Sequence, residues 1–228
     1  MFQLLLVIIY LSFISLGLPD SLLGSAWPAI YPQLNVPVSY AGIISMVIAG
    51  GTIISSLQSD RLTRLLGTGK VTAISVTMTA LALFGFSISD SFIELCLWAI
   101  PYGLGAGSVD AALNNYVALH YESRHMNWLH CMWGVGASVG PYIMGYVMTR
   151  GGTWNGGYRC IAFLQVVLTV IIIFSLPLWK ERPSITDESG KEVAARELSL
   201  KEVFKISGVK EILLCFFCYC ALEQTAGL

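Results

Sequence analysis

Charged side chains are scarce in this chain: only 12% of its 228 residues are Asp, Glu, Lys or Arg, whereas 55% are apolar. A soluble domain typically carries about 25% charged residues, so the composition argues against a water-soluble protein. The chain also lacks a basic tract, and its net charge is −1, which argues against nucleic acid as a partner. The partner that this composition predicts is the lipid bilayer.

The amino-terminal segment lacks the basic residues that precede the apolar run of a secretory signal peptide. Its apolar run, from Met1 to Pro19, is also longer than the roughly 7–15 residues of such a signal. We therefore interpret this segment as a first membrane span that stays in the protein.

Patterns typical of metal sites and enzymes are lacking as well. Cys215, Cys218 and Cys220 lie close together, but no His or carboxylate stands at ligand spacing beside them, so we interpret them as helix-packing residues. The segment from Gly105 to Ser108 has no glycine after the serine and so does not complete a nucleophile motif. We expect no metal, no cofactor and no enzymatic activity.

Apolar segments long enough to cross a bilayer recur along the chain. A transmembrane helix needs about 20 mostly apolar residues, and the pattern predicts an all-α, polytopic membrane protein. The predicted spans are residues 2–30, 38–57, 71–88, 92–119, 127–149 and 158–178, followed by a shorter seventh that begins near residue 211. The seventh reaches the end of the sequence without a polar flank, so we expect a piece of a longer protein.

Basic residues are distributed unequally between the loops. Cytoplasmic loops collect Lys and Arg, and only Arg150 and Arg159 fall on the side opposite the rest. This asymmetry predicts a cytoplasmic N-terminus, because it then places inside the cell Arg61, Arg64, Lys70, Arg124, Lys180, Arg182, Lys191, Arg196, Lys201, Lys205 and Lys210.

The domain organisation follows from one polar segment. Residues 179–210 mix both charge signs and read as a cytoplasmic linker between a bundle of six spans, residues 1–178, and the start of a second one, residues 211–228. Ser199 and Glu202 have the spacing of a capping box, which predicts a short helix at the membrane surface.

Three carboxylates fall inside predicted spans: Asp20, Asp110 and Glu223. Ionisable groups in a membrane are costly and often line the path of a substrate or proton. The alternative for each is a polar contact between helices that serves packing alone. We take Asp20 and Glu223 as candidates for ion coupling and Asp110 as a candidate for solute binding.

Polar residues next to Asp110 extend this candidate site. Asn114 follows Asp110 by one helical turn, so both share a face. A carboxylate beside an amide can hydrogen-bond a hydroxylated or amine-bearing solute. The other predicted solute-binding residues are Asn115 in the same span and Asn127, His130 and Trp133 in the next.

A glycine track with one proline marks the span over residues 127–149. Its members Gly136, Gly140, Pro141 and Gly145 permit close helix packing and a bend. Their spacing resembles the G-x-x-x-G-P-x-x-G signature of the major facilitator superfamily. The loop signature of that superfamily is met in part by Asp60, Arg61 and Arg64, although Ser56 and Thr63 replace its two glycines. The resemblance implies that these three charges form a conformational latch.

The sequence around spans four and five is similar to the fucose/proton symporter branch of the superfamily. In that branch an acid four residues before an asparagine contributes to sugar recognition, which falls here on Asp110 and Asn114. The proton-handling acid of span one falls on Gly24, and Asp20 lies one turn away. The resemblance implies the first half of a twelve-helix fold with a 3+3 inverted repeat, and a second half outside this sequence.

An internal similarity supports this organisation. Residues 13–24 and 216–227 share a Phe, an acid and a Gly at matching offsets, as expected if spans one and seven are equivalent. We therefore expect secondary transport of a small polar solute, a sugar, across the plasma membrane by alternating access, coupled to a proton or other cation. Export of amphiphilic compounds, an intramembrane enzyme and a membrane sensor or scaffold remain as alternatives.

Overall fold

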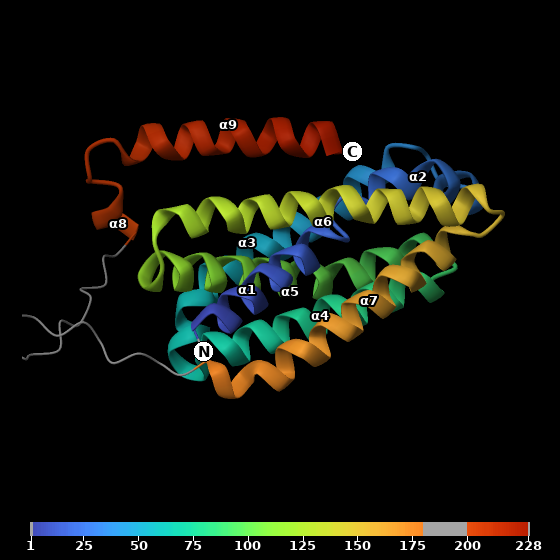
Figure 1. Ribbon diagram of the computed structural model, residues 1–228. Coiled ribbons are helices and arrows are strands. Elements are labelled where there is room, and N and C mark those ends of the chain that lie inside the picture. The colour runs from blue at the N-terminus through green and yellow to red at the C-terminus, as the bar shows by residue number, and fades with distance from the viewer. Residues whose placement is uncertain (1, 180–199, 228) are drawn as a thin grey trace, which may run out of the picture. The chain divides into compact units, whose positions relative to one another are not determined.

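The computed structural model describes residues 2–179 and 200–227, and every regular element within these ranges is a helix (Figure 1). The all-α prediction is therefore confirmed. In chain order, the helices of the first part are α1 (Phe2–Gly17), α2 (Leu22–Gln33), α3 (Tyr40–Leu66), α4 (Thr68–Ile88), α5 (Phe92–His120), α6 (Ser123–Thr149), α7 (Trp154–Ser175) and the 3-10 turn η1 (Leu176–Leu178).

The chain forms two compact units, Met1–Trp179 and Lys180–Leu228. In the second unit, α8 (Leu200–Val203) is a single turn and α9 (Val209–Gly227) is the predicted seventh span. The capping residue Ser199 lies outside the described residues. The predicted surface helix is thus a single turn where the structure describes it.

The first predicted span is two helices rather than one. Pro19 has no N–H to continue the helical pattern, and the backbone turns instead, with Asp20 N donating to Gly17 O at 3.1 Å and Leu22 N donating to Pro19 O at 3.2 Å. The predicted span over residues 2–30 corresponds to one candidate membrane span, residues 4–33, which this turn interrupts. The interruption places Asp20 in a turn between α1 and α2.

The predicted loop after the second span is mostly helix. α3 continues to Leu66, so Arg61 and Arg64 lie on its last turns. Gly67, with φ of 81°, is the single residue between α3 and α4. This positive φ is easily adopted by glycine, which allows so short a connection.

Five helical stretches within the described residues are long and apolar enough to cross a membrane. They are residues 4–33, which include the interruption, and the stretches that correspond to α3, α4, α5 and α7 with η1. α6 is 27 residues long but begins with Arg124, His125 and Asn127, which make its first turns polar. It nevertheless packs against α1 and α7 in the same bundle.

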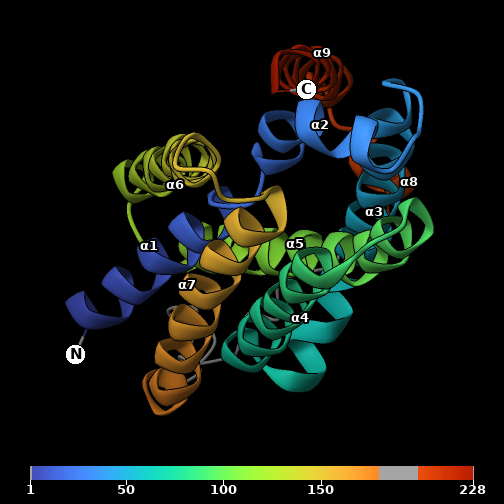
Figure 2. The same cartoon turned by 90° about the vertical axis from the view of Figure 1, so that its right-hand side faces the viewer.

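The helices of the first unit form closely packed pairs. α3 packs on α5, α1 on α6, and α4 on α7. In the end-on view of Figure 2, α6 and α3 lie on opposite sides of this unit, and α4 and α7 lie together. The core is divided between two apolar clusters, one around Leu22, Trp154 and Tyr158 and the other around Ile9, Phe13 and Leu113.

Candidate functional site

A carboxylate and an amide meet on α5. The Asn114 side-chain nitrogen donates to Asp110 Oδ1 at 3.0 Å and to the Asp110 backbone oxygen at 3.0 Å. Asp110 lies in the interior of the 29-residue helix α5, and Asn114 lies one turn nearer its C-terminal end. Asp110 is nevertheless exposed in this unit. The carboxylate is therefore accessible in this unit, with its amide partner already in place.

His130 of α6 joins this pair from a neighbouring helix. Asp110 and His130 lie close enough for their charges to interact. The imidazole also meets the ring of Phe13 on α1 edge to face, with centroids 6.0 Å apart. His130 is exposed, and it lies on the neighbouring helix within electrostatic range of the Asp110 carboxylate.

Asp20 and Trp133 form a second polar group. The Trp133 indole Nε1 donates to Asp20 Oδ2 at 3.1 Å, and Asp20 also lies within electrostatic range of the buried Tyr102 on α5. The interruption after α1 turns the carboxylate toward α6, where the indole N–H meets it. A residue predicted for ion coupling thus contacts one predicted for solute binding.

Glycines allow the backbones of α1 and α6 to approach closely in this region. A Cβ at Gly140 would collide with the Leu18 backbone oxygen, and one at Gly136 with that of Ile14. Gly17 of α1 in turn lies against the Trp133 backbone. The backbones therefore touch at Ile14, Gly17 and Leu18, just before the turn that carries Asp20.

The remaining predicted residues are placed as follows. Asn115 and Asn127 are exposed, Pro141 lies within the continuous helix α6, and no atom outside its own segment lies within 4 Å of where a Cβ on Gly145 would be. Glu223 lies in α9, and its side chain is outside what the structure describes. Asp60 and Arg64 form an ion pair at 3.1 Å on the surface of α3, and Arg61 is exposed beside them.

Sequence reasoning missed two parts of this site. The bond between Trp133 and Asp20 joins residues 113 positions apart, and periodicity within a helix carries no information about such a pair. The interruption itself had a signal, because Pro19 stands within an apolar run and proline breaks helices. No group of three His, Cys, Asp or Glu side chains that could hold a metal ion occurs among the described residues.

Comparison with known proteins agrees with the arrangement. The profile of the Major Facilitator Superfamily matches residues 9–226. This chain is 26% identical to a cis,cis-muconate transport protein of Acinetobacter baylyi over 164 residues, which are 68% of the chain. Over 204 residues, 88% of this chain, it is 19% identical to a multidrug resistance protein of Schizosaccharomyces pombe.

The matched regions cover well under half the length of either relative, 38% of the first and 37% of the second. Together, the apolar helices and the profile match establish an integral, multi-pass membrane protein.

Proposed function

Because this chain belongs to the Major Facilitator Superfamily, we propose that it forms the first half of a secondary transporter for a small polar solute, a sugar. In this proposal residues 211–228 begin the second half, and the rest of that half lies outside this sequence. The observation that carries the proposal is the exposed Asp110 carboxylate, bonded to the half-buried Asn114, within the candidate membrane span α5. Transport by alternating access requires such a polar surface where two halves face each other.

Exposure of a carboxylate in the middle of a span needs a physical explanation. A charged side chain that faces lipid is costly, and those found in membranes generally face a bundle interior or a water-filled cavity. Asp110 is exposed in the first unit taken alone. We infer that it lines a cavity completed by the second half of the transporter.

The chemistry of this group favours a neutral, hydroxyl-rich solute. The Asp110 and Asn114 oxygens accept hydroxyl hydrogens, and the Trp133 ring offers an apolar face for the C–H side of a sugar. Asp20 and Asp110 are both acids, and no Lys or Arg accompanies them in these parts of α1, α5 and α6. A dicarboxylate such as the muconate named for one relative would need cationic groups from the second half.

Asp20 is our candidate for coupling transport to a proton or other cation. Its place in a turn and its bond to Trp133 link its charge to the contact between α1 and α6. Protonation of Asp20 would weaken this charge-assisted hydrogen bond. The contact between α1 and α6 would then separate more easily. Glu223 is the proposed counterpart in the second half. Asp60, Arg61 and Arg64 are proposed to latch one conformation at the cytoplasmic face of the plasma membrane, with the N-terminus also cytoplasmic.

Uptake of radiolabelled sugars into proteoliposomes that contain the full-length transporter tests the proposal. We expect saturable uptake driven by an inward proton gradient. Asp110→Asn should lose about tenfold or more, because a hydrogen bond from a bound solute to a charged carboxylate contributes about 1.5–3 kcal/mol. Asp90→Asn, in the turn between α4 and α5, is the matched control and should leave uptake unchanged. Equal uptake by Asp110→Asn and wild type would contradict the proposed site.

Export of amphiphilic compounds is a second candidate. The similarity to a multidrug resistance protein and the Gly140-Pro141 step support it. A strain that lacks the transporter would then become sensitive to several unrelated drugs and keep normal sugar uptake. A non-transporting sensor or scaffold predicts neither phenotype.

A further inference from the structure

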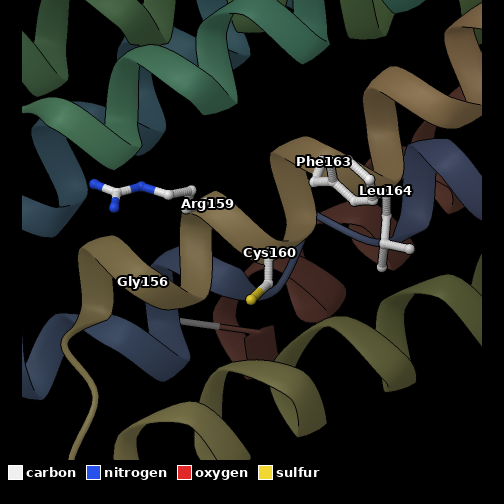
Figure 3. A pocket seen from close by; sticks show the side chains of 5 residues that line it. All are labelled: Gly156, Arg159, Cys160, Phe163 and Leu164. Atoms are coloured by element: carbon white, nitrogen blue, oxygen red, sulfur yellow. The ribbon is translucent and has the colours of Figure 1, made fainter.

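One face of α7 carries a hollow that the proposed transport site does not use. Its lining residues are Gly156, Arg159, Cys160, Phe163 and Leu164, which recur at the three- and four-residue steps of a single helix face. Figure 3 shows the extended Arg159 side chain on one side, Phe163 and Leu164 on the other, and Cys160 between them. The surface of the hollow is almost entirely apolar, and the Arg159 guanidinium extends away from it at one edge.

The depth of Arg159 fits the boundary between headgroups and hydrocarbon. α7 with η1 covers Trp154–Leu178 and is the most apolar of the described candidate spans. Arg159 follows Trp154 by five residues, or about 8 Å at 1.5 Å per residue. From this depth the long side chain can reach the phosphate level while its stem stays in the apolar region.

Arg159 differs from the other arginine on its side of the predicted membrane. The Arg150 guanidinium lies 5.2 Å from the centroid of the Tyr146 ring. Within the described part of the chain, Arg159 has no ion-pair or hydrogen-bond partner. A cation at the edge of a low-dielectric region is stabilised by an anion, and here that anion must come from outside this part of the chain.

Beyond the hollow, the same helix offers a long apolar track. Phe163 is 69% exposed and Phe174 is 80% exposed, and Val167 and Val170 lie between them at 43% and 45%. From Arg159 to Phe174 the helix rises about 22 Å, whereas one leaflet of hydrocarbon is about 15 Å thick. The track is long enough to accompany a whole acyl chain.

We propose that this face of α7 is a binding site for one phospholipid with a net negative headgroup. Arg159 binds the phosphate, Gly156 leaves room for the glycerol region, and Phe163 and Leu164 contact the start of an acyl chain. No carboxylate lines the hollow, so it offers nothing to the ammonium of a zwitterionic headgroup. A free phosphate ion would make the same contact with Arg159 as a lipid phosphate, but it would leave the apolar track uncovered. The track therefore favours a lipid over a free phosphate ion.

Native mass spectrometry of the purified full chain in mild detergent tests this site, with phosphatidylglycerol and phosphatidylcholine of identical acyl chains as probes. Wild type should retain phosphatidylglycerol about tenfold better, a difference of about 1.4 kcal/mol. The phosphate is common to both lipids, but the choline cation of phosphatidylcholine repels the Arg159 guanidinium and the glycerol of phosphatidylglycerol does not. Arg159→Gln should lose this preference. Arg150→Gln, which removes the arginine that already lies over Tyr146, should keep it.

A second variant separates the shape of the hollow from its charge. A Cβ at Gly156 would meet only ordinary contacts, at 3.5 Å from Val147 and 3.7 Å from Thr153. Gly156→Ala should therefore fold, and Gly156→Leu, whose larger side chain is intended to fill the hollow, should bind phosphatidylglycerol about tenfold more weakly with Arg159 intact. Excess inorganic phosphate should not displace the lipid.

Three results would overturn the proposal: an unchanged preference in Arg159→Gln, an equal loss in Arg150→Gln, or displacement by inorganic phosphate. If Arg159→Gln does not fold, Arg159→Lys keeps the charge and should retain the preference. Loss of the preference in folded Arg159→Lys together with normal binding by Gly156→Leu would also count against the site.

Discussion

Two helix crossings in the first unit, α3 on α5 and α1 on α6, both rely on glycines that lie against the backbone of the other helix, but they differ in their polar contacts. Gly103 and Gly107 of α5 lie against the α3 backbone at Ile48 and Thr52, as Gly136 and Gly140 of α6 lie against α1 at Ile14 and Leu18. In both crossings the residue numbers rise together, so each pair of helices runs parallel. Spans two and four thus pack as spans five and one do, as expected for a 3+3 inverted repeat.

The two crossings differ in what lies beside the glycines. Between α3 and α5, side-chain hydroxyls donate to backbone oxygens, from Ser56 to Gly107 at 3.1 Å and from Ser59 to Ser108 at 3.2 Å. Between α1 and α6, one helix is interrupted and the carboxylate of Asp20 takes the indole N–H of Trp133. Serine hydroxyls thus join the uninterrupted helices α3 and α5, whereas the ionisable Asp20 joins the interrupted α1 to α6. We expect the second crossing to be the movable one.

The largest effect is expected when the α1–α6 crossing is forced apart. In Gly140→Ala the new methyl group collides with the Leu18 backbone oxygen, and overpacking of this kind costs roughly 1–3 kcal/mol. Thermal unfolding of the full chain in detergent measures the loss. Gly145→Ala is the matched control on the same helix, because its Cβ enters open space. It should be neutral or slightly stabilising, since alanine favours helix, and an equal loss in both variants would refute the contact.

The equivalent change in the other crossing tests whether the pair is symmetric. A Cβ at Gly103 would collide with the Ile48 backbone oxygen, so Gly103→Ala should lower the free energy of unfolding by a similar 1–3 kcal/mol or so. The same unfolding experiment applies. A variant as stable as wild type would mean that α3 and α5 can separate more easily than α1 and α6.

A smaller loss is expected from Trp133→Phe. This change keeps an aromatic ring and removes the N–H that donates to Asp20. A hydrogen bond to a charged acceptor contributes about 1.5–3 kcal/mol when shielded from water, and less where the carboxylate is exposed. Trp128→Phe on the same helix, at a position 55% exposed, is the control. In the full-length transporter, Trp133→Phe should also shift the pH dependence of uptake, and Trp128→Phe should not.

Removing one hydroxyl between α3 and α5 should cost less again. Ser56→Ala deletes the donor to the Gly107 backbone oxygen, and hydrogen bonds between membrane helices contribute about 0.6 kcal/mol on average. Ser45→Ala on the same helix, for which the structure gives no such bond, serves as reference. A change above about 2 kcal/mol would show that this crossing depends on its hydroxyls more than on its glycines.

The smallest effect on stability should come from Arg64→Gln. The ion pair with Asp60 is on the surface, with side chains 48% and 69% exposed, and such pairs contribute about 0.5 kcal/mol or less. Transport should respond more strongly than unfolding if this residue belongs to the proposed latch. An unfolding midpoint that drops by many degrees would instead assign Arg64 a structural role.

Prediction from sequence succeeded where a single segment contains the information. The apolar runs of α4 and α5 have ends within a few residues of those expected, because length and hydropathy alone decide whether a segment can span a bilayer. The adjacency of Asp110 and Asn114 also followed from helical spacing, and their bond fits it. Prediction failed at Pro19, where the apolar run hid a turn, and at the end of α3, where charged residues resembled a loop but extended the helix.

The sequence by itself determined that this is a helical membrane protein and which residues can share a face, since both depend on composition and on the period of the helix. Only the tertiary structure decided which faces meet. The glycine contacts of Gly136 and Gly140 with α1, the bond from Trp133 to Asp20 and the approach of His130 to Asp110 each join distant segments. Such pairs depend on how closely backbones can approach, which is a property of two helices together.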